Sequence, residues 1–278
     1  MKRDGDGKVK RIIAAALGAL GLAACGAPPE AQPEAAPISE DPSGARALSG
    51  DRFTLEIEGE AADVRLAGIR APRTGPSAEL ASARLQALLD EAGSDLALTP
   101  AGPGRNRYGA LLVTATRGDG TTLQEALVAE GLAAVDSHGD NTAHTARLLE
   151  LEEQARNAGL GAWGLRDLVV HSADPNALAP FLDSVQIIEG RVISTGAARD
   201  GRIYLNFGTD WRTDFTVQVM RRNQRRFEAA GIDLRALGGA IIRVRGWVAE
   251  ENGPMITLDH PEALELVDAP EPARLPGR

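Results

Sequence analysis

The feature that most constrains the fold is a succession of short strand-like and helix-like segments that begins near residue 46. Residues 53–57 alternate between apolar and polar side chains, which predicts a strand. Residues 78–92 carry leucine and alanine at helical spacing, which predicts an amphipathic helix. Further strands are predicted at 62–69, 96–99 and 108–116, a loop at 102–104, and helices at 123–135 and 148–158. This order indicates a mainly β, α+β domain over residues 46–165.

A second run of strand-like segments follows and predicts a small β-rich domain at residues 184–267. Its strands are expected at 185–193, 203–207, 213–219, 240–248 and 255–258, with a helix at 221–237. Residues 166–183 are interpreted as a linker. Residues 268–278 contain three prolines and are interpreted as a disordered tail.

The first 45 residues have the composition of a targeting segment and a tether. Basic residues precede an uncharged apolar run at 12–24, which is too short to span a bilayer as a mature helix. The run ends at Cys25 and resembles a bacterial lipoprotein signal. That resemblance implies cleavage after residue 24, a lipid on Cys25 and a place in the cell envelope facing the periplasm. Gly26 favours the outer membrane where two membranes exist. The alternative is an ordinary secretory signal with an incidental cysteine.

The composition of residues 25–45 and the cysteine count each limit the structure that the chain can form. Residues 25–45 are rich in proline and alanine, which predicts an extended linker. Cys25 is the only cysteine in the chain, so no disulfide forms within it.

The charge balance excludes several kinds of function. The chain has 30 basic and 39 acidic side chains, giving a net charge of −9. All three lysines lie in residues 1–24, so the remainder has no lysine for a Schiff base or for a phosphate-binding loop. An acidic chain is also a poor non-specific ligand of duplex DNA, because that binding depends on positive charge. A local basic patch remains compatible with this composition.

Several short motifs occur in order between residues 46 and 165: Gly50-Asp51, 64–69, Ala71-Pro72, Arg107-Tyr108-Gly109, Asp119-Gly120, 123–133 and Gly161-Ala162-Trp163-Gly164. Through these motifs, residues 46–165 resemble the staphylococcal nuclease (thermonuclease) family. The resemblance implies a five-stranded OB-type barrel with three helices, a fold that commonly binds oligonucleotides. The second region resembles a C-terminal module that follows such domains and implies another small OB-like β-barrel.

The family's catalytic positions are only partly filled. The resemblance implies a calcium ion held by carboxylates, two arginines that grip phosphate and a glutamate that activates water. Asp51 and Arg65 occupy matching positions, but Arg70 replaces a metal carboxylate and Arg73 replaces the glutamate. Ala110 stands where the second arginine is expected. Arginine stays protonated at any working pH, so it cannot bind calcium or act as the base.

We therefore expect an inactive site and no cofactor, with no metal unless Asp51 holds one. Arg65, Arg70 and Arg73 lie within nine residues and form a candidate anion-binding cluster. The alternative is that Arg70 and Arg73 are solvated loop charges without a role.

A second basic cluster lies in the C-terminal region. Arg221, Arg222, Arg225 and Arg226 follow several aromatic residues, and arginine beside aromatic rings suits single-stranded nucleic acid. The alternative is a solvated helix face above a core that contains those rings.

The sequence thus favours a lipid-anchored envelope protein with a non-catalytic thermonuclease-like domain that binds an anion or nucleic acid, or acts as a scaffold. One alternative is an active calcium-dependent nuclease with a rearranged site. Another is a purely structural envelope protein. The sequence identifies no protein partner.

Overall fold

The computed structural model describes residues 42, 44–57 and 59–269. The predicted signal, Cys25, nearly all of the predicted tether and residues 270–278 lie outside the described residues. Within the described part, no helix combines the length and the apolar character needed to cross a membrane.

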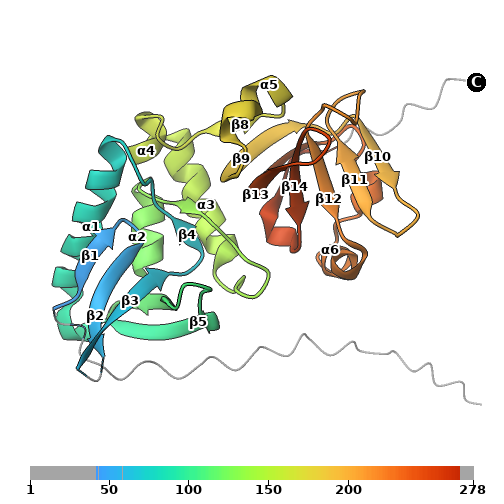
Figure 1. Cartoon of the computed structure of the whole chain (residues 1–278). Helices are drawn as coiled ribbons and strands as arrows, with labels where there is room; N and C mark the ends of the chain where they lie inside the picture. The colour runs from blue at the N-terminus through green and yellow to red at the C-terminus, as the bar shows by residue number, and fades with distance from the viewer. Residues whose placement is uncertain (1–41, 43, 58, 270–278) are drawn as a thin grey trace, which may run out of the picture. The chain divides into compact units, whose positions relative to one another are not determined.

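The N-terminal region, residues 46–164, contains a five-stranded sheet in the order β1-β2-β3-β6-β5 (Figure 1). Neighbouring strands are antiparallel except for β3 and β6, which are parallel. The edge strands β1 and β5 do not pair with each other in the described chain, so the sheet is open and the predicted closed barrel is not formed. The strands are β1 Arg46–Ser49, β2 Arg52–Ile57, β3 Glu60–Leu66, β5 Ala97–Arg105 and β6 Leu111–Thr116, and a separate pair joins β4 Ile69–Arg70 to β7 Ala134–Val135.

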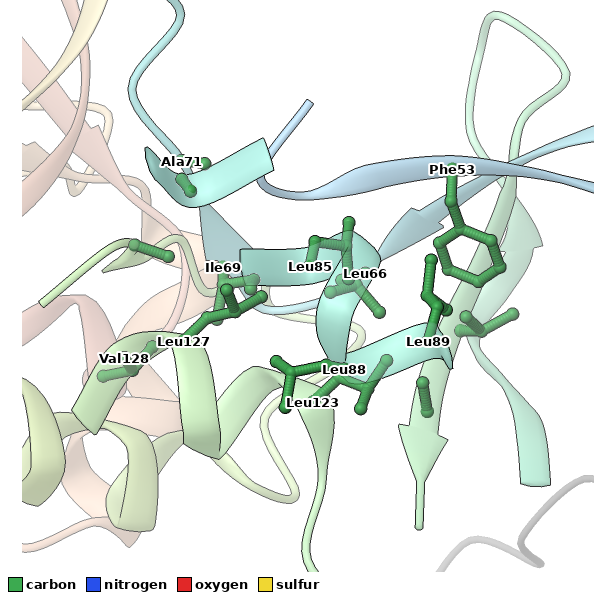
Figure 2. Close-up of a cluster of buried hydrophobic side chains, with 14 of the residues drawn as sticks. Phe53, Leu66, Ile69, Ala71, Leu85, Leu88, Leu89, Leu123, Leu127 and Val128 are labelled. Atoms are coloured by element: carbon green, nitrogen blue, oxygen red, sulfur yellow. The ribbon is translucent and has the colours of Figure 1, made fainter. Parts of the chain in front are cut away.

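Helices pack against this sheet and complete its hydrophobic core (Figure 2). They are α1 Pro76–Ala92, the 3-10 helix Gly93–Asp95, α2 Leu123–Ala129, α3 Thr145–Asn157 and α4 Gly161–Gly164. Helix α2 begins with a capping box, in which Thr122 and Glu125 satisfy each other's backbone N–H groups. The core side chains labelled in Figure 2 are Phe53, Leu66, Ile69, Ala71, Leu85, Leu88, Leu89, Leu123, Leu127 and Val128.

Two predicted elements differ from the structure for local reasons. Helix α2 ends at Ala129 rather than at residue 135, because Gly131 has a φ of 70°. A Cβ at Gly131 would also lie 2.4 Å from the carbonyl oxygen of Leu160. Strand β5 continues through the predicted loop at 102–104, since an edge strand tolerates the missing N–H groups of proline.

The C-terminal region, residues 166–268, contains an eight-stranded sheet built around β13. The order is β10-β11-β12-β14-β13-β9-β8, and β15 also pairs with β13. This pairing neither closes a barrel nor tests the OB-like assignment, which stays a prediction. The strands are β8 Val170–Ser172, β9 Ser184–Arg191, β10 Ser194–Ala197, β11 Ile203–Asn206, β12 Thr216–Val219, β13 Ile241–Glu250, β14 Pro254–Leu258 and β15 Leu264–Asp268.

Short helices connect these strands. The predicted helix at 221–237 is instead a 3-10 turn, a short α-helix and a second 3-10 turn, interrupted at Gly231, where φ is 77°. Residues 166–183, predicted as a linker, contain β8 and α5, and Leu178 is fully buried in the core of this region. The helices are α5 Pro175–Leu178, α6 Gln224–Ala229 and the 3-10 turns Ala179–Phe181, Arg221–Asn223, Leu234–Ala236 and Pro261–Ala263.

Candidate functional site

Asp51 lies in the turn between β1 and β2 with its side chain fully buried. The hydroxyl of Ser49 donates to Oδ1 at 2.8 Å, and Nη2 of Arg73 donates to Oδ2 at 3.4 Å. The Nε atom of Arg65 lies 3.8 Å from the same Oδ2. The carboxylate that was expected to hold a metal is therefore enclosed by two guanidinium groups and a hydroxyl.

A second carboxylate joins this cluster from a distant part of the chain. Asp136 follows β7, and its Oδ2 accepts a hydrogen bond from Nη2 of Arg65 at 3.2 Å. Arg65 thus lies between two acidic groups. The sequence analysis did not identify Asp136 as a site residue, because it is 71 positions from Arg65 and shares no local motif with it.

Arg70 differs from its neighbours because it contacts the other sheet. Its Nη2 donates to the backbone carbonyl of Val185 in β9 at 2.9 Å. Burial lowers the pKa of Arg70, and the positive charges of Arg65 and Arg73 act in the same direction, against the opposing effect of Asp136 and Asp51. Within the described residues, its buried Nε has no hydrogen-bond partner.

These residues do not fit the calcium ion that the family implies. Calcium prefers six to eight oxygen ligands, and carboxylates supply most of its affinity. Asp51 and Asp136 are each already engaged by arginine, and Arg70 and Arg73 bring positive charge to two positions where the sequence resemblance implied carboxylates. We therefore derive no catalytic step through a metal.

The arginine cluster opens onto a groove of about 980 Å³ lined by residues of both regions. Eight arginines and three aspartates line it, so its wall is strongly positive although the whole chain is negative. The arginines are Arg65, Arg70, Arg73, Arg105, Arg107, Arg222, Arg226 and Arg245.

Four of these arginines are exposed and form no ion pair with an acid in the described part of the chain: Arg105, Arg107, Arg222 and Arg226. Arg105 donates to the carbonyl of Gly109 at 2.6 Å, and Arg226 approaches the carbonyl of Asp259 at 3.2 Å. Only two members of the predicted 221–226 cluster line the groove, while Arg221 and Arg225 do not. Arg105 and Arg107 were not predicted to bind a ligand, although their position beside Tyr108 was a usable signal.

Two exposed aromatic rings accompany these four arginines. Tyr108 is 79% exposed and Trp247 is 53% exposed, and both line the groove. Arg107 stacks over the Tyr108 ring at 4.9 Å. By contrast, Phe215, from the aromatic group upstream of Arg221, is fully buried in the core.

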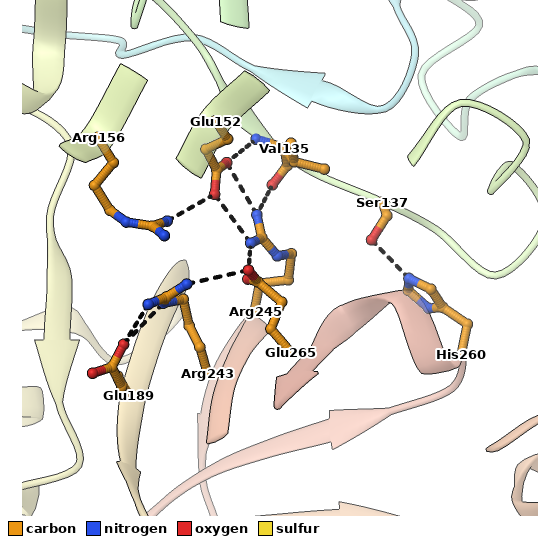
Figure 3. A network of polar contacts seen from close by, with 9 residues as sticks. All are labelled: Val135, Ser137, Glu152, Arg156, Glu189, Arg243, Arg245, His260 and Glu265. Atoms are coloured by element: carbon orange, nitrogen blue, oxygen red, sulfur yellow. Dashed lines mark hydrogen bonds and ion pairs between the residues drawn. The ribbon is translucent and has the colours of Figure 1, made fainter. Parts of the chain in front are cut away.

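A buried polar network connects the two regions behind the groove (Figure 3). The guanidinium of Arg245 in β13 donates to both oxygens of Glu152 in α3, at 3.0 and 3.1 Å. It also donates to the carbonyl of Val135 at 3.1 Å and pairs with Glu265. Since Glu152 also accepts the backbone N–H of Val135, this network holds β7 and α3 of one region against β13 of the other.

The N-terminal region is similar in sequence to a known protein family. No curated protein matches the chain at a significant level. Residues 63–164 match the family model described as "Staphylococcal nuclease homologue", and this match covers β3 to α4, including Arg65, Arg70 and Arg73. The chain therefore contains a staphylococcal nuclease-like domain.

Proposed function

We propose that this protein has a nuclease fold without nuclease activity and binds a polyanion in the arginine-lined groove, with a nucleic-acid strand as the leading ligand. The observation that carries the proposal is the combination, on the wall of one groove, of two exposed aromatic rings and four arginines that no acid pairs in the described chain. Guanidinium groups bind phosphate through parallel hydrogen bonds and do not require a metal.

The predicted anion-binding cluster of Arg65, Arg70 and Arg73 should contribute less to ligand binding than the exposed arginines of the groove. Arg65 and Arg73 already pair with Asp51 or Asp136, so much of their charge is neutralised within the protein. The exposed arginines at 105, 107, 222 and 226 form no ion pair with an acid among the described residues, so their charge is less neutralised than that of Arg65 and Arg73. Binding should therefore depend on both regions.

The aromatic rings favour a single strand over a duplex. A base can stack on Tyr108 or Trp247 only when it is not held inside a double helix, and such stacking contributes about 1–3 kcal/mol per base. The negative net charge of the chain also disfavours a long duplex, which would interact with surfaces outside the groove.

The test is a titration of a labelled single-stranded oligonucleotide by fluorescence anisotropy over a range of salt concentrations. The double variants Arg105→Ala/Arg107→Ala and Arg222→Ala/Arg226→Ala should each weaken binding and reduce the salt slope by about 0.7 for every phosphate that the variant no longer neutralises. Trp247→Ala should weaken binding without changing that slope. Arg199→Ala/Arg235→Ala, which removes exposed arginines outside the groove lining, is the matched control. Equal effects of the control and groove variants would refute the proposal.

The retained Asp51 and Arg65 support one competing function, a calcium-dependent nuclease. That function predicts digestion of single-stranded DNA that requires calcium and disappears in Asp51→Asn. Our proposal predicts no digestion above background with calcium or with chelator. Calcium-dependent digestion of single-stranded DNA that is lost in Asp51→Asn would show that the protein is a nuclease and would contradict our proposal.

The proposal includes anchoring of the mature protein to the cell envelope through a lipid on Cys25. The sequence around Cys25 supports this part. Full-length protein should incorporate labelled palmitate and partition into membranes, whereas Cys25→Ser should do neither. Unchanged membrane partitioning of Cys25→Ser would remove the anchor from the proposal and leave the groove unaffected.

A further inference from the structure

Three polar side chains in the wall of the groove form a hydrogen-bonded chain that anion binding does not require. The hydroxyl Oγ of Ser137 lies 2.8 Å from Nε2 of His260 (Figure 3). The other ring nitrogen of His260, Nδ1, lies 2.6 Å from Oδ1 of Asp259. Ser137 follows β7 in the nuclease-like domain, while the other two residues follow β14.

The chemistry of these groups fixes the direction of the hydrogen bond to Asp259. An ionised carboxylate only accepts hydrogen bonds, so Nδ1 of His260 carries a proton and donates to Asp259. When the ring is neutral, Nε2 has a free lone pair and accepts the proton of the Ser137 hydroxyl. The hydrogen bond from His260 and the positive charge of Arg226 lower the pKa of Asp259, against the opposing effect of burial, and favour its ionised state.

The segments that follow β7 and β14 place these three side chains in the wall of the groove. Ser137, His260 and Asp259 all line it. Ser137 is 8% exposed and His260 is 5% exposed, so the serine–histidine pair is largely shielded from bulk water. A Cβ at Gly139 would lie 2.6 Å from Nη1 of Arg226 and 3.4 Å from Oδ2 of Asp259, so both side chains lie close against the loop that follows Ser137.

We propose that Ser137 is a nucleophile that hydrolyses carboxylic esters carrying an anionic group, with His260 as general base and Asp259 as the residue that orients it. The order of atoms, from hydroxyl to Nε2 and from Nδ1 to carboxylate, is the arrangement that activates serine in hydrolases on unrelated folds. The anionic group of the substrate is bound by the arginines of the groove, of which Arg226 lies beside Asp259.

The proposed reaction has two stages, acylation of Ser137 and hydrolysis of the acyl-serine. Oγ of Ser137 attacks the ester carbonyl carbon while its proton moves to Nε2 of His260. The bond from that carbon to the alcohol oxygen breaks, and the alcohol leaves with the proton from His260. Water then attacks the acyl-serine, gives its proton to Nε2, and releases the carboxylic acid with return of the proton to Ser137.

The first test is covalent labelling of purified full-length protein with a fluorophosphonate probe, followed by mass spectrometry of the digested protein. The proposal predicts an adduct on Ser137 and loss of labelling in Ser137→Ala. Ser94→Ala, which removes an exposed serine outside the groove lining, should label normally. Absence of an adduct on folded wild-type protein, or labelling that persists in Ser137→Ala, would overturn the proposal.

The second test measures hydrolysis of nitrophenyl acetate with and without a sulfonate on the ring. We expect the sulfonated ester to react faster, and His260→Gln to reduce its rate by about 10²-fold or more. Glutamine can still hydrogen-bond to Ser137 but cannot take its proton, so a merely structural contact would leave the rate unchanged and refute the proposal. The oligonucleotide titration of the wild-type protein does not depend on labelling or ester hydrolysis, so failure of the esterase proposal and failure of the binding proposal are distinguishable.

Discussion

Arg245 and Arg65 both approach a buried carboxylate, but the two arginines differ in their access to water. Arg245 has a side chain only 4% exposed, and its partner Glu152 is 1% exposed. Arg65 is 25% exposed, although its neighbour Asp51 is fully buried. The first arginine is enclosed between the two regions, whereas the second faces the groove. Burial therefore distinguishes an ion pair that only stabilises the fold from an ion pair whose arginine is also accessible to a ligand.

The charge balance of the two clusters shows the same contrast. The enclosed network pairs three arginines with three glutamates, so it is neutral as a group: Arg156, Arg243, Arg245, Glu152, Glu189 and Glu265. Without Arg245, which belongs to that network, the groove lining has seven arginines against three aspartates. A neutral network offers no net charge to a further anion, while the groove has unbalanced positive charge in contact with solvent.

The largest effect should come from breaking the enclosed network. Replacing Arg245 with methionine leaves Glu152 charged and buried, which typically costs about 3–5 kcal/mol. We expect this loss in the free energy of unfolding, measured by denaturant titration. The additional change Glu152→Leu should restore much of it, because an apolar pair then replaces a buried carboxylate whose remaining ion-pair partner, Arg156, lies 3.5 Å away.

The matched control for this prediction is Arg202→Ala. Arg202 and Asp200 form an exposed pair, and such pairs contribute less than about 1 kcal/mol. A loss in Arg245→Met as small as the loss in the control would show that burial does not distinguish the two kinds of pair.

An intermediate effect is expected at Arg65. Arg65→Ala removes one neighbour of Asp51 and the hydrogen bond to Asp136, but Asp51 still interacts with Ser49 and Arg73. We expect a loss of about 1–3 kcal/mol in stability. Oligonucleotide affinity should fall less than in Arg105→Ala/Arg107→Ala. A larger fall in affinity at Arg65 would instead make the predicted cluster the principal binding site.

The smallest effect should come from a carboxylate on the surface. Hydrogen bonds from the hydroxyl and backbone N–H of Ser77 lower the pKa of Asp167 below its usual value. A lowered pKa in the folded state gives stability above the unfolded pKa, near 4, and that stability is lost as the pH falls through the folded pKa. Asp167→Asn should therefore be less stable than wild type at pH 7, with the difference shrinking below about pH 4. A difference that is constant with pH would contradict this account.

The sequence predicted those elements whose periodicity is continuous. Strand β2 and helix α1 lie close to their predicted positions, because one face of each packs into the core. It did not predict β1, β8 or β15, which have three to five residues and too few side chains to show a period. Glycines at 131 and 231 ended two predicted helices early through their positive φ angles.

The candidate site was predictable only where it is local in sequence. The spacing of Arg65, Arg70 and Arg73 indicated a cluster, and the structure places all three on one groove. Their partners were not predictable, since Asp136 and the carbonyl of Val185 lie 71 and 115 positions from the arginines they bind. A sequence pattern identifies the side chains that are near each other in the chain, but not the groups that neutralise them across the fold.

The hydrogen bond between Arg70 and Val185 couples position 70 to the contact between the two sheets. An aspartate at this position has a shorter side chain without an N–H group, so it could not donate to the Val185 carbonyl. A carboxylate placed there would therefore weaken the contact with the second sheet, so any change toward a metal ligand at this position carries a structural cost.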